Sequence, residues 1–373
     1  MARPAPELMD DLVEEVLIRC PPDDPARLVR AALVCKPWCR VVSGAGFRRR
    51  YRQLHRSPPM LGIFNRGLAT RFVPTTSFRP SCADLAARCH WWAVDARHGH
   101  ILFCDMASRR SAHMDFIVSN PIIGELRKLP SLQPLPSSRD FRATLLCRTD
   151  GCDHLDCPFS PFIVVYLVIG SRKITAFVYS SETGMWSETA SIELEHPDGL
   201  FLRQFGTLAG NALYFLLHKC PRILEYDVGK QELSVVSLPS ECCAHCLTTE
   251  DGRLGFATVQ EEELCMWSRL VCQNGWEWVQ RRVIKLKNFP PISDVPISCA
   301  IFAFVDDVHI VFWNFSIGIF DIHLKSGCVT KVGEITDLFQ RVTPYMSFYT
   351  PSAFGAASTC EGLRASTSDA SQS

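Results

Sequence analysis

The chain has 373 residues, with 39 basic and 39 acidic side chains and 47% hydrophobic residues. Its length favours two domains, and its neutral charge balance argues against a whole-chain electrostatic role on nucleic acid or an anionic membrane. The longest apolar run, 162–169, is too short for a membrane span, and residues 1–8 lack the apolar core of a secretory signal. We therefore expect a cytoplasmic or nuclear protein.

The 18 cysteines fall below the density that is typical of disulfide-rich scaffolds. Free cysteine packs as a small hydrophobic side chain. Most of the cysteines are therefore expected to be reduced core residues, in particular those inside apolar runs. These are Cys104, Cys147, Cys299 and Cys328.

Residues 8–55 show helical rather than strand periodicity. Over 8–20, apolar residues recur at four-residue intervals, and acidic residues lie early in the segment. Pro21-Pro22 must end this helix, and Asp24-Pro25 is typical of the start of the next one. We expect three to four short helices: 8–20, Pro25 to about Cys35, a short segment from Pro37, and a basic helix over 47–55. So small a unit buries little apolar surface, so its apolar face is expected to meet a partner.

The segments Leu8–Pro25 and Leu28–Arg40 resemble an F-box, specifically that of plant F-box proteins from grasses. The most specific part is Leu33–Trp38, with the sequence Leu-Val-Cys-Lys-Pro-Trp. The resemblance implies that residues 6–56 bind a Skp-type adaptor, which joins F-box proteins to a cullin and a ubiquitin-conjugating enzyme. The implied adaptor-binding residues are Leu8, Leu12, Val16, Leu17, Pro21, Leu28, Leu33, Val34, Cys35 and Trp38.

One residue departs from the F-box pattern. Met9 stands where the family usually has the proline of a Leu-Pro pair, and proline would fix the entry into the first helix. We expect the departure to loosen that end of the helix without removing the apolar contacts. An alternative interpretation is that the helices form only a cap packed on the following domain, which helical periodicity alone would permit.

The basic run Arg48–Arg52, with Arg56, raises the question of nucleic-acid binding or nuclear import. Residues 1–60 hold 11 basic and 7 acidic side chains, which leaves 28 basic and 32 acidic ones in the remainder. A nucleic-acid footprint normally spreads over a broader patch. We therefore favour a single solvated helix face and predict neither nucleic acid nor membrane as a partner.

From residue 60 onward, short apolar runs between turns predict an all-β domain. Two motifs recur in fixed order: a strand that ends in phenylalanine, and a second strand that ends in a bulky residue before a polar turn. The bulky residues are 61, 47, 41 and 53 positions apart: Val118, Tyr179, Tyr226, Trp267 and Phe320. Such a period predicts a kelch-sized β-propeller. Five copies are recognisable, and 61–64 is a candidate for strands of a sixth.

Each blade is a small sheet that cannot bury both faces alone, so neighbouring blades must stack and the ring must close. The expected outer strands carry Trp or Leu-Pro segments: Leu129-Pro130, Met185-Trp186, Leu238-Pro239 and Trp276–Trp278. An F-box followed by such repeats, with the motifs Val94–Gly99 and Cys152–Cys157, resembles the grass family of F-box proteins with a β-propeller. The resemblance implies a propeller-like domain over 60–351; the polar tail 352–373 is expected to be disordered.

The segment 147–157 contains three thiols, an imidazole and three carboxylates, so a metal site has to be considered. Zinc ligands usually come in closely spaced pairs from two strands, whereas these candidates share one loop with uneven gaps. We favour a polar loop between blades and assign no metal. The candidates are Cys147, Cys152, His154 and Cys157. The cluster Cys242–Cys246 has one Cys-x-x-Cys pair and receives the same interpretation, with a site shared by both clusters left open.

No nucleophile elbow, P-loop or dinucleotide-binding glycine pattern is present in the sequence. His98 and His100 flank a turn glycine and are interpreted as exposed turn or strand-edge residues. Trp91-Trp92 and the pair Trp276 and Trp278 are interpreted as packed or rim aromatics. We therefore expect neither a catalytic residue nor a cofactor.

The resemblance implies a substrate-recognition subunit of an SCF-type cullin ubiquitin ligase, acting in ubiquitin-dependent protein degradation. Its partners would be a Skp-type adaptor, the cullin through that adaptor, and an unidentified target protein on the propeller. Two alternatives stay open. One is a propeller enzyme or small-molecule binder with a helical cap, and the other is an adaptor-binding scaffold that does not promote degradation.

Overall fold

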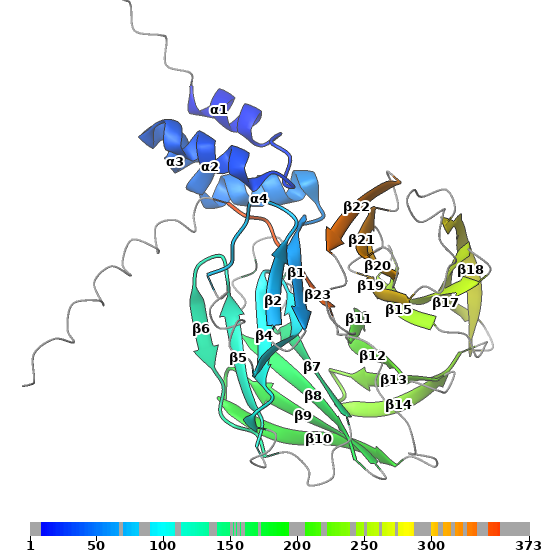
Figure 1. The fold of residues 1–373 in the computed structure, drawn as a ribbon. Coiled ribbons are helices and arrows are strands. Elements are labelled where there is room, and N and C mark those ends of the chain that lie inside the picture. The colour runs from blue at the N-terminus through cyan, green and yellow to red at the C-terminus, as the bar shows by residue number, and fades with distance from the viewer. Residues whose placement is uncertain are drawn as a thin grey trace, which may run out of the picture.

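In the residues that it describes, the computed structural model has four helices followed by a ring of β-sheets, so the predicted small all-α unit and all-β propeller are confirmed (Figure 1). None of these described helices combines the length and apolar character that a membrane crossing requires. The predicted disordered tail, 352–373, lies outside the described residues. The structure describes residues 9–350 except 67–69, 82–89, 109–112, 134–139, 150–151, 153, 155–156, 158–160, 171–172, 194–205, 218–221, 239–243, 250–251, 261–262, 273–274, 287–299, 305–308, 315–317, 324–326 and 334–341.

Prolines and turn residues set the ends of the helices. Pro25 and Pro37 lie in the first turns of the second and third helices, where the N–H that proline lacks has no helical partner. The first helix ends at Leu17 rather than at residue 20, because the N–H groups of Arg19 and Cys20 bond to carbonyls three residues back. The helices are α1 (Asp10–Leu17), α2 (Pro25–Val34), α3 (Lys36–Ser43) and α4 (Ala45–His55).

A common apolar core holds the helices together. Tyr51 of α4 is buried in it, and its hydroxyl donates a hydrogen bond of 2.9 Å to the carbonyl of Cys20. Burial raises the pKa of Tyr51, so the hydroxyl keeps the proton that it donates. The buried members are Val13, Leu17, Ile18, Leu28, Ala31, Val42, Phe47, Tyr51 and Phe348. Phe348 lies beyond the last strand, so the helical core includes a side chain from the far end of the chain.

The β domain contains six antiparallel sheets within the described ranges, five of four strands and one of three. The two recurring sequence motifs fall on the second and third strands of each four-stranded sheet, so the predicted repeat is confirmed. The strands are β1 (Met60–Arg66), β2 (Thr70–Pro74), β3 (Trp91–Arg97), β4 (His100–Asp105), β5 (Asp115–Asn120), β6 (Glu125–Lys128), β7 (Asp140–Cys147), β8 (Phe162–Ile169), β9 (Lys173–Ser180), β10 (Met185–Glu193), β11 (Thr207–Ala209), β12 (Ala212–Leu216), β13 (Arg222–Asp227), β14 (Glu232–Ser237), β15 (Ala244–Thr248), β16 (Leu254–Gln260), β17 (Glu263–Cys272), β18 (Gly275–Lys285), β19 (Ala300–Phe304), β20 (His309–Asn314), β21 (Gly318–His323), β22 (Cys328–Gly333) and β23 (Val342–Met346).

The three-stranded sheet closes the ring by pairing the first and last strands of the domain. Its order is β2-β1-β23, and β1 therefore supplies the strand that was expected for a sixth blade. β23 also lies against β3 of the next sheet. The hydroxyl of Thr343 donates to the carbonyl of Ala93 at 3.0 Å, and that of Tyr345 donates to the carbonyl of Gly99 at 2.9 Å. These bonds fasten the closing strand to β3 and to the turn between β3 and β4.

Apolar cores fill the seams between neighbouring sheets, as β8 shows. Its side chains at 162, 164, 166 and 168 pack with residues of β4 and β5, and those at 163, 165, 167 and 169 pack with residues of β12 and β13. Both faces of the strand are covered because a blade lies on each side. The sequence of a strand in this position is therefore one continuous apolar run.

The motif Val94–Gly99 joins three blades through polar contacts. Asp95 on β3 accepts a hydrogen bond of 2.8 Å from the N–H of Leu145 on β7, and it pairs with Arg97 at 3.1 Å. Arg97 donates in turn to the carbonyl of Gly206, just before β11. The buried carboxylate is therefore hydrogen-bonded and paired, which is what burial of a charge requires.

Trp and Leu-Pro segments meet at two blade seams. Trp186 of β10 donates its indole N–H to the carbonyl of Pro130, after β6, at 2.8 Å. Trp278 of β18 donates to the carbonyl of Ser237, at the end of β14, at 3.4 Å. In both cases the Trp segment of one blade bonds to the end of the preceding blade, so Trp186 and Trp278 are structural aromatics at the seams.

Candidate functional site

Apolar side chains project outward from α1 and from the end of α2. Leu12 and Val16, one helical turn apart on α1, are 48% and 65% exposed. Leu33 and Val34, the last residues of α2, are 80% and 64% exposed, and Cys35 beside them is exposed as well. We call these five residues the outer apolar residues. Single exposed apolar residues are common, but a group of them on one small module is typical of an interaction site.

Helical periodicity explains why α1 has apolar residues on two faces. Val13 and Leu17 are one turn apart and point into the helical core, while Leu12 and Val16 follow the same spacing one position earlier and point outward. The inner pair already fills the core, so packing within the module does not use the outer pair. The outer pair is therefore available to a partner.

The predicted adaptor-binding residues divide by burial. Five of them are the outer apolar residues. Leu17 and Leu28 are buried in the helical core, Leu28 with only 1% exposed, so they support the helices, and their contact with an adaptor stays a prediction. Pro21 and Trp38 are half-buried, and Trp38 packs against the same core. Leu8 lies outside the described residues.

Ion pairs from the basic helix orient α1. Arg50 of α4 pairs with Glu14 at 2.6 Å and also with Glu15. Hydrogen bonding to the Arg50 guanidinium lowers the pKa of the Glu15 carboxyl. These contacts place part of the basic run inside the module's own charge network and hold α1 against α4. The orientation of Leu12 and Val16 follows from that attachment.

Phe348 connects the helices to the propeller. It follows β23, and its ring packs edge-on against Tyr51 of α4 with 5.9 Å between ring centroids. The guanidinium of Arg52 lies over the same ring at 5.9 Å. The N–H of Ser347 donates to the carbonyl of Pro59 at 3.2 Å, so the two chain segments run together between the domains (Figure 1). The helical module is thereby packed against the ring as well as tethered to it.

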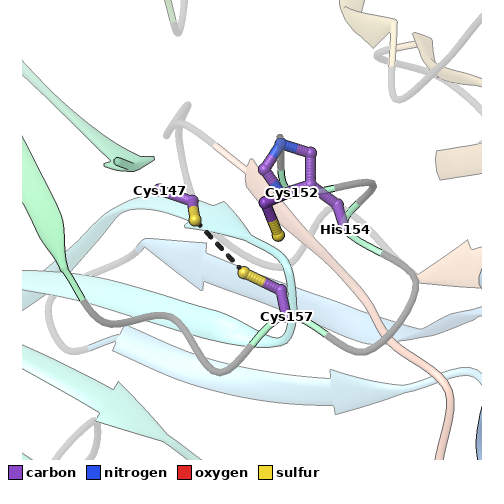
Figure 2. Close-up of side chains that lie close together, drawn as sticks. All are labelled: Cys147, Cys152, His154 and Cys157. Atoms are coloured by element: carbon purple, nitrogen blue, oxygen red, sulfur yellow. Dashed lines mark hydrogen bonds between the residues drawn. The ribbon is translucent and has the colours of Figure 1, made fainter. Parts of the chain in front are cut away.

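A second candidate site lies at the end of β7 (Figure 2). The sulfur atoms of Cys147, Cys152 and Cys157 and a ring nitrogen of His154 all lie within 4.8 Å of one another. Cys147 is the last residue of β7, and the other three follow in the connection to β8. The sequence argument against a zinc site, uneven gaps on one loop, therefore does not hold in three dimensions, because the loop folds back onto the strand end.

The two histidines beside Gly99 are not the exposed residues that the sequence predicted. Both are half-buried, and the ring of His98 stacks on that of His154 with 4.0 Å between centroids. Burial lowers the pKa of His98 to about 3. His100 donates from Nδ1 to the carbonyl of His98 at 3.1 Å. The turn between β3 and β4 thus packs directly against the cysteine and histidine cluster of the next blade.

The other cysteine cluster does not extend this site in the described part of the chain. Cys246 is buried among apolar residues of β12, β13 and β16, at a different blade seam. Burial raises the pKa of its thiol to about 12. Cys242 and Cys243 lie outside the described residues. Cys246 is therefore a core residue and not a member of a shared metal site.

Two family models match the chain. The F-box domain model matches residues 7–50, and a model described as F-box protein AT5G49610-like, beta-propeller, matches residues 92–353. The chain belongs to this plant-type F-box family. The match covers the helices that carry the outer apolar residues and most of the ring in this F-box protein.

Solved structures resemble this F-box protein only distantly. The WD40 domain of SCAP from fission yeast has 11% identity and a TM-score of 0.36, over 66% of this chain and 52% of that chain. TolB from Acinetobacter baumannii has 12% identity and a TM-score of 0.39, over 76% of this chain and 68% of that chain. The Cps50 (Swd1) β-propeller domain from Myceliophteria thermophila has 10% identity and a TM-score of 0.38, over 68% of this chain and 88% of that chain. The chain thus spans about half the length of the SCAP chain that it matches. No curated protein sequence matches.

Two positions of this F-box protein were missed by the sequence reasoning. Met9 was considered only as a departure at the helix start, yet its apolar side chain is exposed one turn before Leu12. Its hydrophobicity was the available signal. Phe348 completes the helical core from beyond the last strand of the propeller, and no local pattern in the sequence points to that contact.

Proposed function

We propose that this protein is the substrate-recognition subunit of an SCF-type cullin ubiquitin ligase. In this proposal the F-box binds a Skp-type adaptor, the adaptor binds a cullin, and the propeller binds a target protein. The observation that carries the proposal is the exposure of Leu12, Val16, Leu33 and Val34 within the residues that the F-box domain model matches. Membership of an F-box family with a propeller supports it.

Burial of the outer apolar residues would supply much of the adaptor affinity. Fully burying an exposed Val or Leu side chain is worth roughly 1.5–3 kcal/mol. Association also costs translational and rotational freedom, so several such side chains have to contribute together. The inner residues stabilise the helices, and the outer apolar residues do not contribute to the helical core. The outer apolar residues can therefore be buried against an adaptor without disturbing the module.

The proposed mechanism is proximity. The protein holds a target near the ubiquitin thioester, which raises the effective concentration of the target's lysines without a catalytic group in this chain. Packing of Phe348 on Tyr51 supports the proposal, because a packed junction restricts the directions in which the propeller can point. We place this activity in the cytoplasm, the nucleus or both, which imaging of a fluorescent fusion in plant cells tests.

Adaptor binding is tested with the double variant Val16→Asp, Leu33→Asp. Both positions are exposed, so the substitutions leave the helical core intact, whereas truncation of Trp38 would disturb it. Each new carboxylate would have to be desolvated in an apolar interface. We expect binding to a purified plant Skp-type adaptor to weaken at least about 100-fold in calorimetric titration.

The control is Leu126→Asp, which places one such carboxylate on an exposed leucine of β6, far along the chain from the helices. It is expected to bind the adaptor as the wild type does. Equal binding by the wild type and the double variant, or no binding by the wild type, would contradict the proposal.

Ubiquitination is tested separately from adaptor binding. Proteins enriched on the wild type under proteasome blockade are compared with those on the double variant, and their turnover is followed with and without cullin activity. We expect slower turnover when the cullin is inactive. Unchanged turnover together with intact adaptor binding would instead support a scaffold that does not promote degradation.

A further inference from the structure

We propose that Cys147, Cys152, His154 and Cys157 bind one structural Zn²⁺ ion. This site is independent of the outer apolar residues and lies on the propeller. It would fasten the long connection between β7 and β8 to the end of β7.

The spacing of the four ligand atoms fits a tetrahedral zinc site. With Zn–S bonds of about 2.3 Å, two sulfurs of a tetrahedral site lie about 3.8 Å apart, and sulfur and nitrogen lie about 3.6 Å apart. The sulfurs of Cys157 and Cys147 are 3.3 Å apart, and all four ligand atoms lie within 4.8 Å of one another. Small side-chain adjustments would therefore bring all four to bonding distance of one ion.

The donor set selects the metal. Three thiols and one imidazole suit Zn²⁺, whereas Mg²⁺ and Ca²⁺ prefer oxygen ligands. Four protein ligands fill the tetrahedral shell and leave no open position for water or substrate, so the site is structural rather than catalytic. Thiols bind zinc as thiolates, so binding releases up to three protons and weakens as the pH falls.

Groups around the cluster already orient its members. The N–H of Thr149 donates to the sulfur of Cys147 at 3.4 Å, a contact that would stabilise a metal-bound thiolate. The ring of His98 stacks on His154 at 4.0 Å and fixes the plane of that imidazole. These contacts come from the loop itself and from the neighbouring blade, so the cluster is supported from two sides.

The position of the cluster gives the zinc a specific structural task. His98 precedes Gly99, whose carbonyl accepts the hydrogen bond from Tyr345 on the closing strand. The segment after Tyr345 leads directly to Phe348 and the helices. The zinc loop therefore lies on the side of the ring that carries the F-box. Zinc binding would order a loop beside the turn that anchors the closing strand.

A disulfide between Cys147 and Cys157 is the competing outcome, because their sulfurs are neighbours. The structure contains no disulfide at these described cysteines. A disulfide would use two of the four candidate ligands and would not explain why Cys152 and His154 lie beside them. Zinc accounts for all four side chains.

The test is metal analysis of the full-length chain, purified without a histidine tag from zinc-supplemented cells. We expect about one zinc per chain in the wild type, and less than about 0.1 in Cys157→Ser and in His154→Ala. The control Cys39→Ser removes an exposed thiol of α3 and should retain the full amount. Absence of zinc from the wild type, or equal zinc in Cys157→Ser, would overturn the proposal.

A second measurement uses only the wild type and so does not depend on how the variants fold. Chelator-treated protein is titrated with Co²⁺, which reports tetrahedral thiolate ligation by its visible absorption. We expect saturation at one equivalent and displacement by Zn²⁺. Thiol titration of the unfolded chain completes the test: loss of two thiols without bound metal would establish the disulfide instead.

Discussion

The helical module and the propeller handle apolar surface in opposite ways. In the propeller, β8 is apolar on both faces, and each face is covered by a neighbouring blade of the same chain. In the helical module, α1 is also apolar on two faces, yet only the face of Val13 and Leu17 is covered. In a repeat domain, each blade is covered by the neighbouring blades of the same chain. A single small helical module has no such neighbouring copy. In the proposed complex, the Skp-type adaptor would cover the remaining face.

The largest expected difference between the two regions is in thiol reactivity. Cys35 and Cys39 of the helical module are exposed, and Cys246 of the propeller is buried with its pKa raised from 9.0 to about 12. At pH 8 that rise alone lowers the thiolate fraction roughly 1,000-fold, and burial adds steric exclusion. Peptide mass spectrometry after brief alkylation should find the two helical cysteines modified and Cys246 modified only after unfolding. Equal alkylation rates at the helical cysteines and at Cys246 would contradict this difference between the two regions.

Within the helical module, inner and outer leucines should have separable effects. Leu28→Ala opens a cavity in the helical core and is expected to destabilise the module by about 2–5 kcal/mol. Leu33→Ala, at an exposed position, should change stability by no more than about 0.5 kcal/mol while weakening adaptor binding. Far-UV circular dichroism during thermal unfolding and adaptor titration provide the two readings. A stability loss of equal size in both variants would show that Leu33 belongs to the core.

At the blade seams, the expected effect is smaller. Trp186→Phe keeps the aromatic ring and removes the indole donor to Pro130, which should cost about 1 kcal/mol of propeller stability. Trp278→Phe removes a longer bond, at 3.4 Å, and should cost less. Urea denaturation, followed by the fluorescence of the remaining tryptophans, tests whether Trp186→Phe loses more stability than Trp278→Phe. The reverse order would mean that the indole bonds do not determine seam stability.

The smallest expected effect is at the start of α1. Met9 has a φ of −60°, which proline adopts without strain, so the absent family proline is compatible with the observed backbone. Met9→Pro should stabilise the module by about 0.4–1 kcal/mol by restricting the unfolded chain. A higher melting temperature of the helical signal would confirm this. A lower one would indicate that the Met9 side chain or N–H makes a contribution of its own.

The sequence was most informative where local chemistry decides the outcome. Pro25 and Pro37 marked the starts of helices, and the recurring bulky residues such as Tyr226 and Phe320 all fall on third strands of blades. These features depend on backbone geometry and on short-range periodicity. They can be read without knowledge of which segments meet in space.

Features that depend on chain ends meeting, or on loops folding back, could not be read in this way. The ligand cluster around His154 exists because the loop returns to the end of β7, and spacing in the sequence does not encode that return. Cys328 lies in an apolar run and was expected in the core, yet it is exposed, because an outer strand has one open side. Cys104 is buried as expected, since β4 lies between other strands.

The pairing of β1 with β23 also sets an order of events during protein synthesis. The helices leave the ribosome before the propeller strands, but their core includes Phe348, and β1 can pair with β23 only after the rest of the ring has been synthesised. Completion of the F-box core and closure of the propeller therefore both depend on the segment 342–348. A chain that stops inside the propeller lacks both Phe348 and β23, so its helical core is incomplete and its ring is open.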